Sequence, residues 1–383
     1  MTMQISSKLP HVGTNIFTIM SQMAMQHNAI NLSQGFPSFA TPEPLRELVY
    51  HYMNEGFNQY PPMMGIPKLR QQLAAKTAQL YGRTVSPDNE ITICTGASEG
   101  LFSAISAVVS AGDEVILFDP AFDCYQPIVE LNGGRAVHIP LTSPDYRFDW
   151  QQLRDTITPK TRLIILNSPH NPTGTTLSAT DLDTLAEITR DSNILILSDE
   201  VYEHIIFDGQ THQSILCHAE LAERALVISS FGKTYHATGW KIGYCIAPPA
   251  LTTEFRRIHQ FVTFSVMTPM QYALADFLEQ SPEYYLNLSA FYQQKRDTFC
   301  YLLEEFRFKF TPTQGTFFQL LDYSNITDQS DVEYARYLTR EVGVASIPIS
   351  VFYEQLPQEH VLRFCFAKDD ATLQKAARRL CEI

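Results

Sequence analysis

The sequence predicts an α/β protein with a large, mostly parallel sheet covered by helices on both faces and a smaller α+β domain. Short Ile/Leu/Val runs alternate with helical segments through the first two thirds of the chain, a pattern typical of buried parallel strands. After Pro248 helices dominate and strand-like runs become few. We therefore expect a large domain at 42–280 and a small domain formed by 1–41 and 281–383.

The individual elements follow from hydrophobic periodicity and from glycine and proline positions. Early helices are expected at 16–26, 45–54 and 66–81. The strands expected in the large domain are 91–94, 114–118, 136–140, 163–166, 194–197, 225–228 and 242–246. The helices expected around them are 99–110, 125–131, 150–156, 181–190, 251–264 and 271–279. The C-terminal part is expected to hold helices at 284–306, 332–341 and 371–381, and strands at 308–311, 317–321 and 361–366.

Composition excludes several classes of protein. The 383 residues carry a formal net charge of −13, which argues against a nucleic-acid-binding surface. No apolar run approaches the length of a membrane span, and the N-terminus lacks the pattern of a signal peptide. The seven cysteines are scattered without a CxxC pair, so we expect neither a metal site nor disulfides, and a cytoplasmic location.

Lys233 is the residue around which a candidate site can be built. It lies in SSFGKTYHATGWKIGY, Ser229 to Tyr244, just after the apolar run 225–228. An amine at the end of a buried strand can form a Schiff base with a carbonyl group. Considered alone, a loop lysine reaching water explains it better.

Other polar or small residues also follow predicted strands, and the carboxyl ends of such strands form the ligand crevice of an open α/β sheet. These residues are Gly96, Ala97, Ser98, Asn171, Asp199, Tyr202 and Ser230. We expect them to contribute to one site.

An anion site is indicated at 96–98, where small residues open a helix with free N–H groups. Ser230 and Lys241 could add a hydroxyl and a cation. An ordinary helix cap by Ser98 is an equally open explanation.

Three further motifs each allow two explanations. Asn171 in NSPHNPTG is either a ligand contact or part of a turn. Asp199 in SDEVYE could hold a protonated ring nitrogen, with Tyr202 on a ring oxygen, or could cap a helix. Arg363, inside the apolar VLRFCFA, needs an anion, either a substrate carboxylate or a structural ion-pair partner.

Together these motifs resemble the fold-type I pyridoxal-phosphate enzymes, in particular the class I and II aminotransferases. The resemblance covers almost the whole chain, with NSPHNPTG, SDEVYE, the lysine stretch and VLRFCFA in family order. SQGFP, NQY and DPAFDCY are most similar to the branch that holds kynurenine and glutamine aminotransferases and a bacterial methionine aminotransferase.

The resemblance implies pyridoxal 5'-phosphate as cofactor and assigns a role to each motif. Lys233 would carry the cofactor as a Schiff base and act as the catalytic base, while Asp199 would pair with its ring nitrogen. The remaining cofactor contacts would be Asn171 and Tyr202 at the 3-oxygen, Phe122 on the ring, and Gly96, Ala97, Ser98, Ser230 and Lys241 around the phosphate. Many family members have arginine where this chain has Lys241.

The substrates implied are an amino acid and a 2-oxo acid, in a homodimer with shared active sites. Arg363 would bind the substrate α-carboxylate, with Gly35 and Asn171 nearby, and Tyr60 would reach the phosphate of a partner subunit. We expect methionine and aromatic or other large neutral amino acids as donors. The residues expected to line the pocket are Phe17, Phe36, Phe122, Phe264 and Met267.

Three alternatives remain open at this point. A carbon–sulfur β-lyase could use the same site. A cofactor-sensing regulator would need a DNA-binding domain, and a nucleotide-binding enzyme would show GxGxxG or GxxxxGK[ST]; neither feature occurs.

Overall fold

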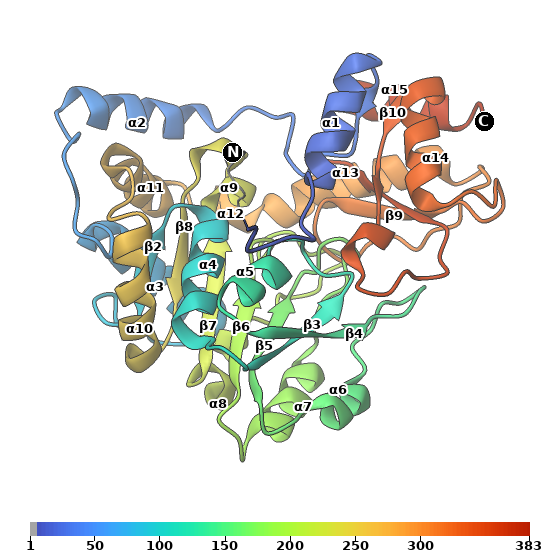
Figure 1. Cartoon of the computed structure of the whole chain (residues 1–383). Coiled ribbons are helices and arrows are strands. Elements are labelled where there is room, and N and C mark those ends of the chain that lie inside the picture. Colours follow the sequence, from blue (N-terminus) through green and yellow to red (C-terminus); the bar gives the residue numbers. More distant parts are fainter. Residues whose placement is uncertain (1–5) are drawn as a thin grey trace, which may run out of the picture.

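A seven-stranded sheet forms the centre of the protein (Figure 1). The computed structural model describes residues 6–383, so the start of the predicted 1–41 segment lies outside the described residues. In spatial order the strands are β2 (Ile91–Cys94), β8 (Gly243–Ile246), β7 (Ala225–Ser230), β6 (Leu195–Asp199), β5 (Thr161–Asn167), β3 (Glu114–Asp119) and β4 (Arg135–Pro140). β8 alone runs in the direction opposite to the other strands, so its pairings with β2 and β7 are antiparallel. The predicted mostly parallel sheet is confirmed.

Helices cover both faces of this sheet, because its strands are apolar on both sides. Ile164 and Leu166 pack into one apolar cluster, whereas Leu163 and Ile165 pack into the other. The first cluster includes α2 (Glu43–Asn54), α3 (Pro67–Tyr81), α6 (Trp150–Thr156), α7 (Ala179–Thr189), α8 (Ala219–Ala222) and α11 (Thr268–Gln280). The second includes α4 (Gly96–Val108), α5 (Tyr125–Leu131) and α10 (Pro249–Val262).

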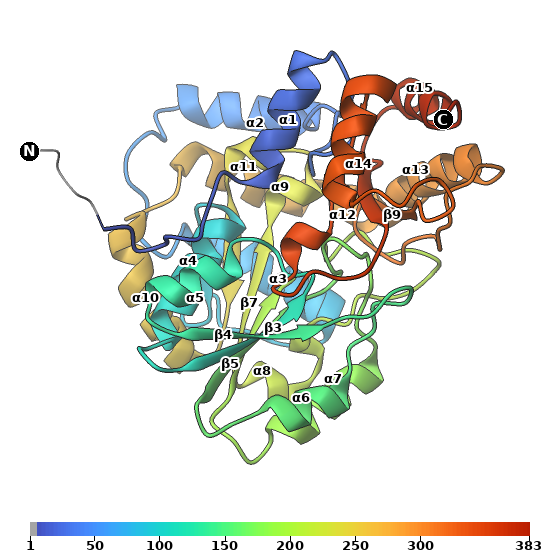
Figure 2. The same cartoon turned by 45° about the vertical axis from the view of Figure 1, so that its right-hand side comes forward.

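A third apolar cluster joins the two ends of the chain, and Figure 2 shows α1 beside the C-terminal helices. Met20 and Leu32 pack there with residues such as Phe299 and Leu380. Its helices are α1 (Ile16–Gln26), α13 (Leu288–Leu303), α14 (Asp331–Tyr337) and α15 (Asp370–Leu380), with the short α12 (Glu283–Leu286) before α13. Its strands are β1 (Ile30–Asn31), β9 (Phe318–Asp322), β10 (Val344–Ala345), β11 (Ile347–Pro348) and β12 (Val361–Cys365). The domain limits at 41 and 280 stay predictions.

Three expected elements differ from those observed. No strand forms at 308–311, where Lys309 makes only an isolated bridge to Asp322, and Pro312 follows with no N–H to extend a ladder. The expected helix 284–306 is interrupted at Asn287, between α12 and α13. The expected helix 332–341 leaves α geometry after Tyr337 and ends at Gly343, whose φ of 76° is left-handed. Among residues 6–383, no helix is long and apolar enough to cross a membrane.

Candidate active site

A cavity of about 240 Å³ lies at the carboxyl ends of the large-sheet strands, where residues of β12 and of the loop after β1 also reach it. It brings together nearly all of the residues that the sequence singled out. Those that line it are Gly35, Ala97, Ser98, Phe122, Asn171, Asp199, Tyr202, Ser230, Lys233, Lys241 and Arg363, with Phe17.

Lys233 lies in the single-turn helix α9 (Phe231–Thr234), directly after β7. Ser230 caps this turn by accepting a 3.1 Å hydrogen bond from the Gly232 N–H. The Lys233 ammonium donates to the carbonyl of Gly35 at 2.8 Å. Burial lowers the pKa of Lys233 to about 8, and the charges of Arg363 and Lys241 act in the same direction. A substantial share of neutral, nucleophilic amine is therefore available near pH 8.

Asp199 is the last residue of β6 and is buried. Its Oδ2 accepts a 2.7 Å hydrogen bond from the Tyr125 hydroxyl, and its Oδ1 accepts a 3.3 Å bond from the Val201 N–H. Asn167 fixes the backbone here, since its side-chain amide donates to the Asp199 carbonyl at 2.9 Å. Burial nevertheless raises the pKa of Asp199 to about 6. Such a carboxylate favours a cationic N–H partner in the cavity.

The start of α4 meets Lys241 closely. Gly96 has a φ of +75°, and a Cβ there would lie 3.1 Å from Cε and 3.3 Å from Nζ of Lys241. Gly96 thus supports the site from behind Lys241 rather than lining the cavity. The N–H groups that open α4, at Ala97 and Ser98, combine with this ammonium into a site suited to an anion.

Arg363, on β12, is 1% exposed. Its Nη1 donates to Oδ1 of Asn171 and its Nη2 to the carbonyl of Ser33, both at 2.8 Å. The guanidinium lies 3.8 Å from the centre of the Phe318 ring. Its buried Nε has no hydrogen-bond partner, and no carboxylate pairs with the group, among residues 6–383. The structural ion pair considered for Arg363 is therefore not formed, and the guanidinium can receive an anion from the cavity.

Four predicted residues lie away from the cavity. Tyr60 is 81% exposed and packs its ring on Phe264, with centroids 5.0 Å apart. Phe36, Phe264 and Met267 are also exposed and do not line the cavity of this chain. The prediction that these three line the pocket is wrong for the single chain, because the surrounding loops direct them outward.

Three residues of the cavity region were missed. Tyr125 lies three residues after Phe122 in DPAFDCY, a spacing that could have indicated side chains on one side of the chain. Asn167 opens NSPHNPTG at the end of β5 and carried the same strand-end signal as Asp199. Phe318 gave no signal beyond its place in an expected strand.

Comparison with known proteins identifies the family. Residues 27–380 match the family Aminotransferase class I and II. Methionine aminotransferase of Escherichia coli is 49% identical over 377 residues, covering 98% of both chains, and its crystal structure superposes with a TM-score of 0.98 over all of both chains.

Two further relatives extend the comparison. Kynurenine–oxoglutarate transaminase of Dictyostelium discoideum is 36% identical, covering 100% of this chain and 97% of its own. The structure of N-succinyldiaminopimelate aminotransferase from Mycobacterium tuberculosis is 36% identical with a TM-score of 0.95, covering 99% of this chain and 100% of its own. The chain therefore belongs to the class I and II aminotransferases and is a transaminase.

Proposed function

We propose that the protein is a pyridoxal-phosphate-dependent aminotransferase that transfers the amino group of methionine and of aromatic or other large neutral amino acids to a 2-oxo acid. The observation that carries the proposal is the single cavity shared by Lys233, Asp199 and Arg363. The 49% identity to the Escherichia coli methionine aminotransferase supports the choice of donor.

The residues present fit the cofactor. Asp199 offers a buried carboxylate to a ring N–H, and the start of α4 with Ser230 and Lys241 offers N–H, hydroxyl and ammonium donors to a phosphate. Phe122 lines the same cavity and would stack on the ring. The bound cofactor supplies an aldehyde for covalent attachment and an electron sink for the α-carbon of the substrate.

Lys233 would carry the cofactor and then serve as the base. With a pKa of about 8, its free amine accepts the α-proton of the amino acid readily at mildly alkaline pH, and it holds that proton for return. Burial raises the pKa of the Tyr202 hydroxyl, so that it stays a hydrogen-bond donor. Oδ1 of Asn171 accepts a hydrogen bond from Arg363, so the amide N–H groups of Asn171 remain as donors in the cavity that Tyr202 also lines.

Arg363 would bind the α-carboxylate of the substrate. Its Nη1 and Nη2 are held by Asn171 and Ser33, which fixes the plane of the guanidinium, and its Nε remains to donate. Lys233, Lys241 and Arg363 are the cations that line the cavity in the described part of the chain, and each already has a role. None remains for a second carboxylate, so a neutral donor is favoured over aspartate.

A homodimer would complete the site. Tyr60, Phe264 and Met267 are exposed, and the Thr268 hydroxyl donates to the Gln59 carbonyl, which holds their two segments together. An exposed aromatic group of this kind suits a second copy of the chain. Sedimentation of the active enzyme should give a dimer, and a fully active monomer would contradict it. The cytoplasmic location remains a prediction.

Two experiments test the function. The purified enzyme should absorb near the boundary of ultraviolet and visible light, and borohydride should fix the cofactor to Lys233, as peptide mapping would reveal. Lys233→Arg keeps the positive charge but cannot carry the cofactor, so transamination should fall by at least about 10²–10⁴-fold. A Lys233→Ala variant with full transamination would refute the mechanism.

A screen of amino donors tests the proposed substrate preference. We expect methionine and phenylalanine to exceed aspartate in kcat/KM, and a clear preference for aspartate would overturn the assignment. Kynurenine and glutamine belong in the screen, because a kynurenine transaminase is among the relatives. Ammonia and pyruvate formed from a cysteine conjugate without a 2-oxo acid would favour the β-lyase alternative.

A further inference from the structure

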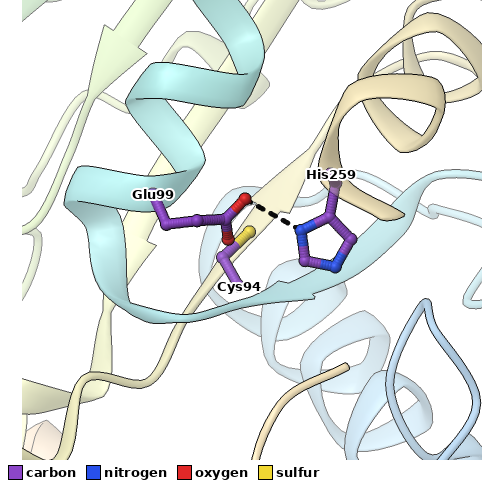
Figure 3. Close-up of side chains that lie close together, drawn as sticks. All are labelled: Cys94, Glu99 and His259. Carbon is purple, nitrogen blue, oxygen red and sulfur yellow. Dashed lines mark hydrogen bonds and ion pairs between the residues drawn. The ribbon is translucent and has the colours of Figure 1, made fainter. Parts of the chain in front are cut away.

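Three polar side chains, two buried and one partly buried, lie close together behind the first turn of α4 (Figure 3). Glu99 comes from α4, His259 from α10 and Cys94 from the end of β2, and their potential ligand atoms all lie within 4.8 Å of one another. His259 is 0% exposed. The mechanism described so far uses none of them.

The thiol of Cys94 is not poised to bind a metal ion. Burial, followed by the charge of Glu99, raises the pKa of Cys94 well above its usual value, so the sulfur keeps its proton. The Sγ instead lies 3.6 Å from the Thr92 carbonyl. Glu99 and His259 contact each other directly, with Oε1 and Nδ1 2.9 Å apart.

Each nitrogen of the His259 ring faces an oxygen atom. When Glu99 is ionised, both of these oxygens are acceptors and neither can donate a hydrogen bond. Nδ1 faces Glu99, and Nε2 lies 3.2 Å from the Met63 carbonyl. A ring that donates from both nitrogens is an imidazolium.

Glu99 has the surroundings of an ionised carboxylate. Besides His259, it accepts a 3.0 Å bond from the Thr95 N–H and a 2.6 Å bond from the Ser103 hydroxyl. These contacts suit an ion pair between the buried His259 and the partly buried Glu99.

The position of the pair connects it to the cofactor site. Because Glu99 holds the N–H of Thr95, the residue that caps α4, its negative charge lies at the helix start that would bind the phosphate. An uncompensated carboxylate there would oppose the phosphate and the favourable helix dipole. We propose that His259 is a positioning residue that cancels the charge of Glu99 and so keeps the start of α4 receptive to the cofactor's phosphate. This inference rests on the proposed function.

The test compares pyridoxal 5'-phosphate with pyridoxal, which lacks the phosphate, in titrations of the apo-enzyme. His259→Gln should weaken binding of the phosphorylated form by about tenfold while changing pyridoxal binding little. Ser103→Ala, which removes a donor to Glu99 without changing charge, is the matched control and should keep the wild-type ratio of the two dissociation constants.

A double variant tests the role of charge independently. The double variant Glu99→Gln/His259→Gln removes both charges and should restore the ratio, even if His259→Gln alone folds poorly. The proposal is overturned if His259→Gln leaves the ratio of the two dissociation constants unchanged. It is also overturned if the double variant keeps the phosphate-specific loss. A wild-type enzyme with no preference for the phosphorylated form would instead contradict the proposed function itself.

Discussion

The Tyr125 hydroxyl donates a 2.7 Å hydrogen bond to Oδ2 of Asp199, and both side chains are buried. The bond joins the start of α5 to the end of β6. Burial raises the pKa of Asp199, whereas this bond and the N–H of Val201 lower it. Tyr125 thus helps Asp199 to remain ionised at neutral pH, the state required to hold a protonated ring nitrogen.

Tyr125→Phe should shift the acidic limb of the pH profile to higher pH. The variant loses a bond that stabilises the carboxylate, so the pKa of Asp199 rises further and ionisation requires more alkaline solution. A hydrogen bond to a charged group contributes about 1.5–3 kcal/mol, so kcat/KM near pH 6 should fall by roughly tenfold or more. Tyr334→Phe is a suitable control because that buried hydroxyl has no partner among residues 6–383. An unchanged pH profile for Tyr125→Phe would contradict the role.

Arg363→Lys should raise KM for the amino donor more than it lowers kcat. Lysine keeps the charge but cannot hold Asn171 and Ser33 while donating to a carboxylate in one plane. Losing one or two charge-assisted bonds of about 1.5–3 kcal/mol each predicts a rise in KM of at least about tenfold. The absorption of the bound cofactor should persist. Arg296→Lys, which alters an arginine paired with Asp208, should leave KM unchanged, and an equal KM in both variants would argue against carboxylate binding by Arg363.

Gly96→Ala tests the close approach of Lys241 to α4. An added methyl group would meet Cε of Lys241 at 3.1 Å and would also strain a left-handed backbone. Gly112→Ala separates the two effects, because Gly112 has a φ of +89° with nothing within 4 Å of its Cβ position. Both variants should lose about 1–2 kcal/mol of stability. Only Gly96→Ala should bind pyridoxal 5'-phosphate more weakly, as measured by dialysis against phosphate buffer. If both variants retain the cofactor equally, the contact between Gly96 and Lys241 does not contribute to binding.

The sequence predicted those site residues that directly follow a strand. Asp199 and Lys233 each follow an Ile/Leu/Val run, and parallel strands bring such ends to one edge. The contact of Tyr125 with Asp199 depends on how α5 packs against the sheet, which periodicity does not specify. The pairing of β1 with β10 was also missed, because two residues on each strand carry no periodic signal.

The outward direction of Phe264 illustrates a second limit. An aromatic residue near a site motif is equally compatible with a pocket wall and with an exposed surface until the backbone is known. Phe264 follows the C-cap of α10 with a φ of 63°, and its side chain is 56% exposed. Loop conformations of this kind are set by local backbone geometry and tertiary contacts rather than by hydrophobic pattern.

Lys76 and Glu203 form a buried ion pair that sequence reasoning did not find. Lys76 Nζ lies 2.9 Å from Glu203 Oε1, and both side chains are at most 7% exposed. The hydroxyls of Ser229 and Tyr244 donate to the same oxygen at 2.5 Å. Burial alone would raise the pKa of Glu203, but the charge of Lys76 and these hydrogen bonds hold it well below its usual value. Glu203 follows Tyr202 in the chain and Ser229 precedes Ser230, so the ion pair and its hydrogen bonds join two segments that carry site residues.

Lys76→Met should destabilise the protein by about 3–5 kcal/mol at neutral pH, because it leaves a buried carboxylate without its cation. A depressed pKa contributes stability above the carboxyl's unfolded value of about 4.3, and that contribution is lost as pH falls through the folded pKa. In the variant, burial acts without the charge of Lys76 and raises the pKa of Glu203, so the carboxyl takes up a proton at higher pH and the destabilisation eases. The difference between wild type and variant in urea unfolding should therefore shrink as pH falls from 7.5, and shrink further below about pH 4.3, where the wild-type contribution is lost. Arg154→Met, which breaks the ion pair with Glu187 whose side chains are 37% and 63% exposed, should cost only about 0–1 kcal/mol. Equal losses in the two variants would show that the buried carboxylate does not depend on Lys76.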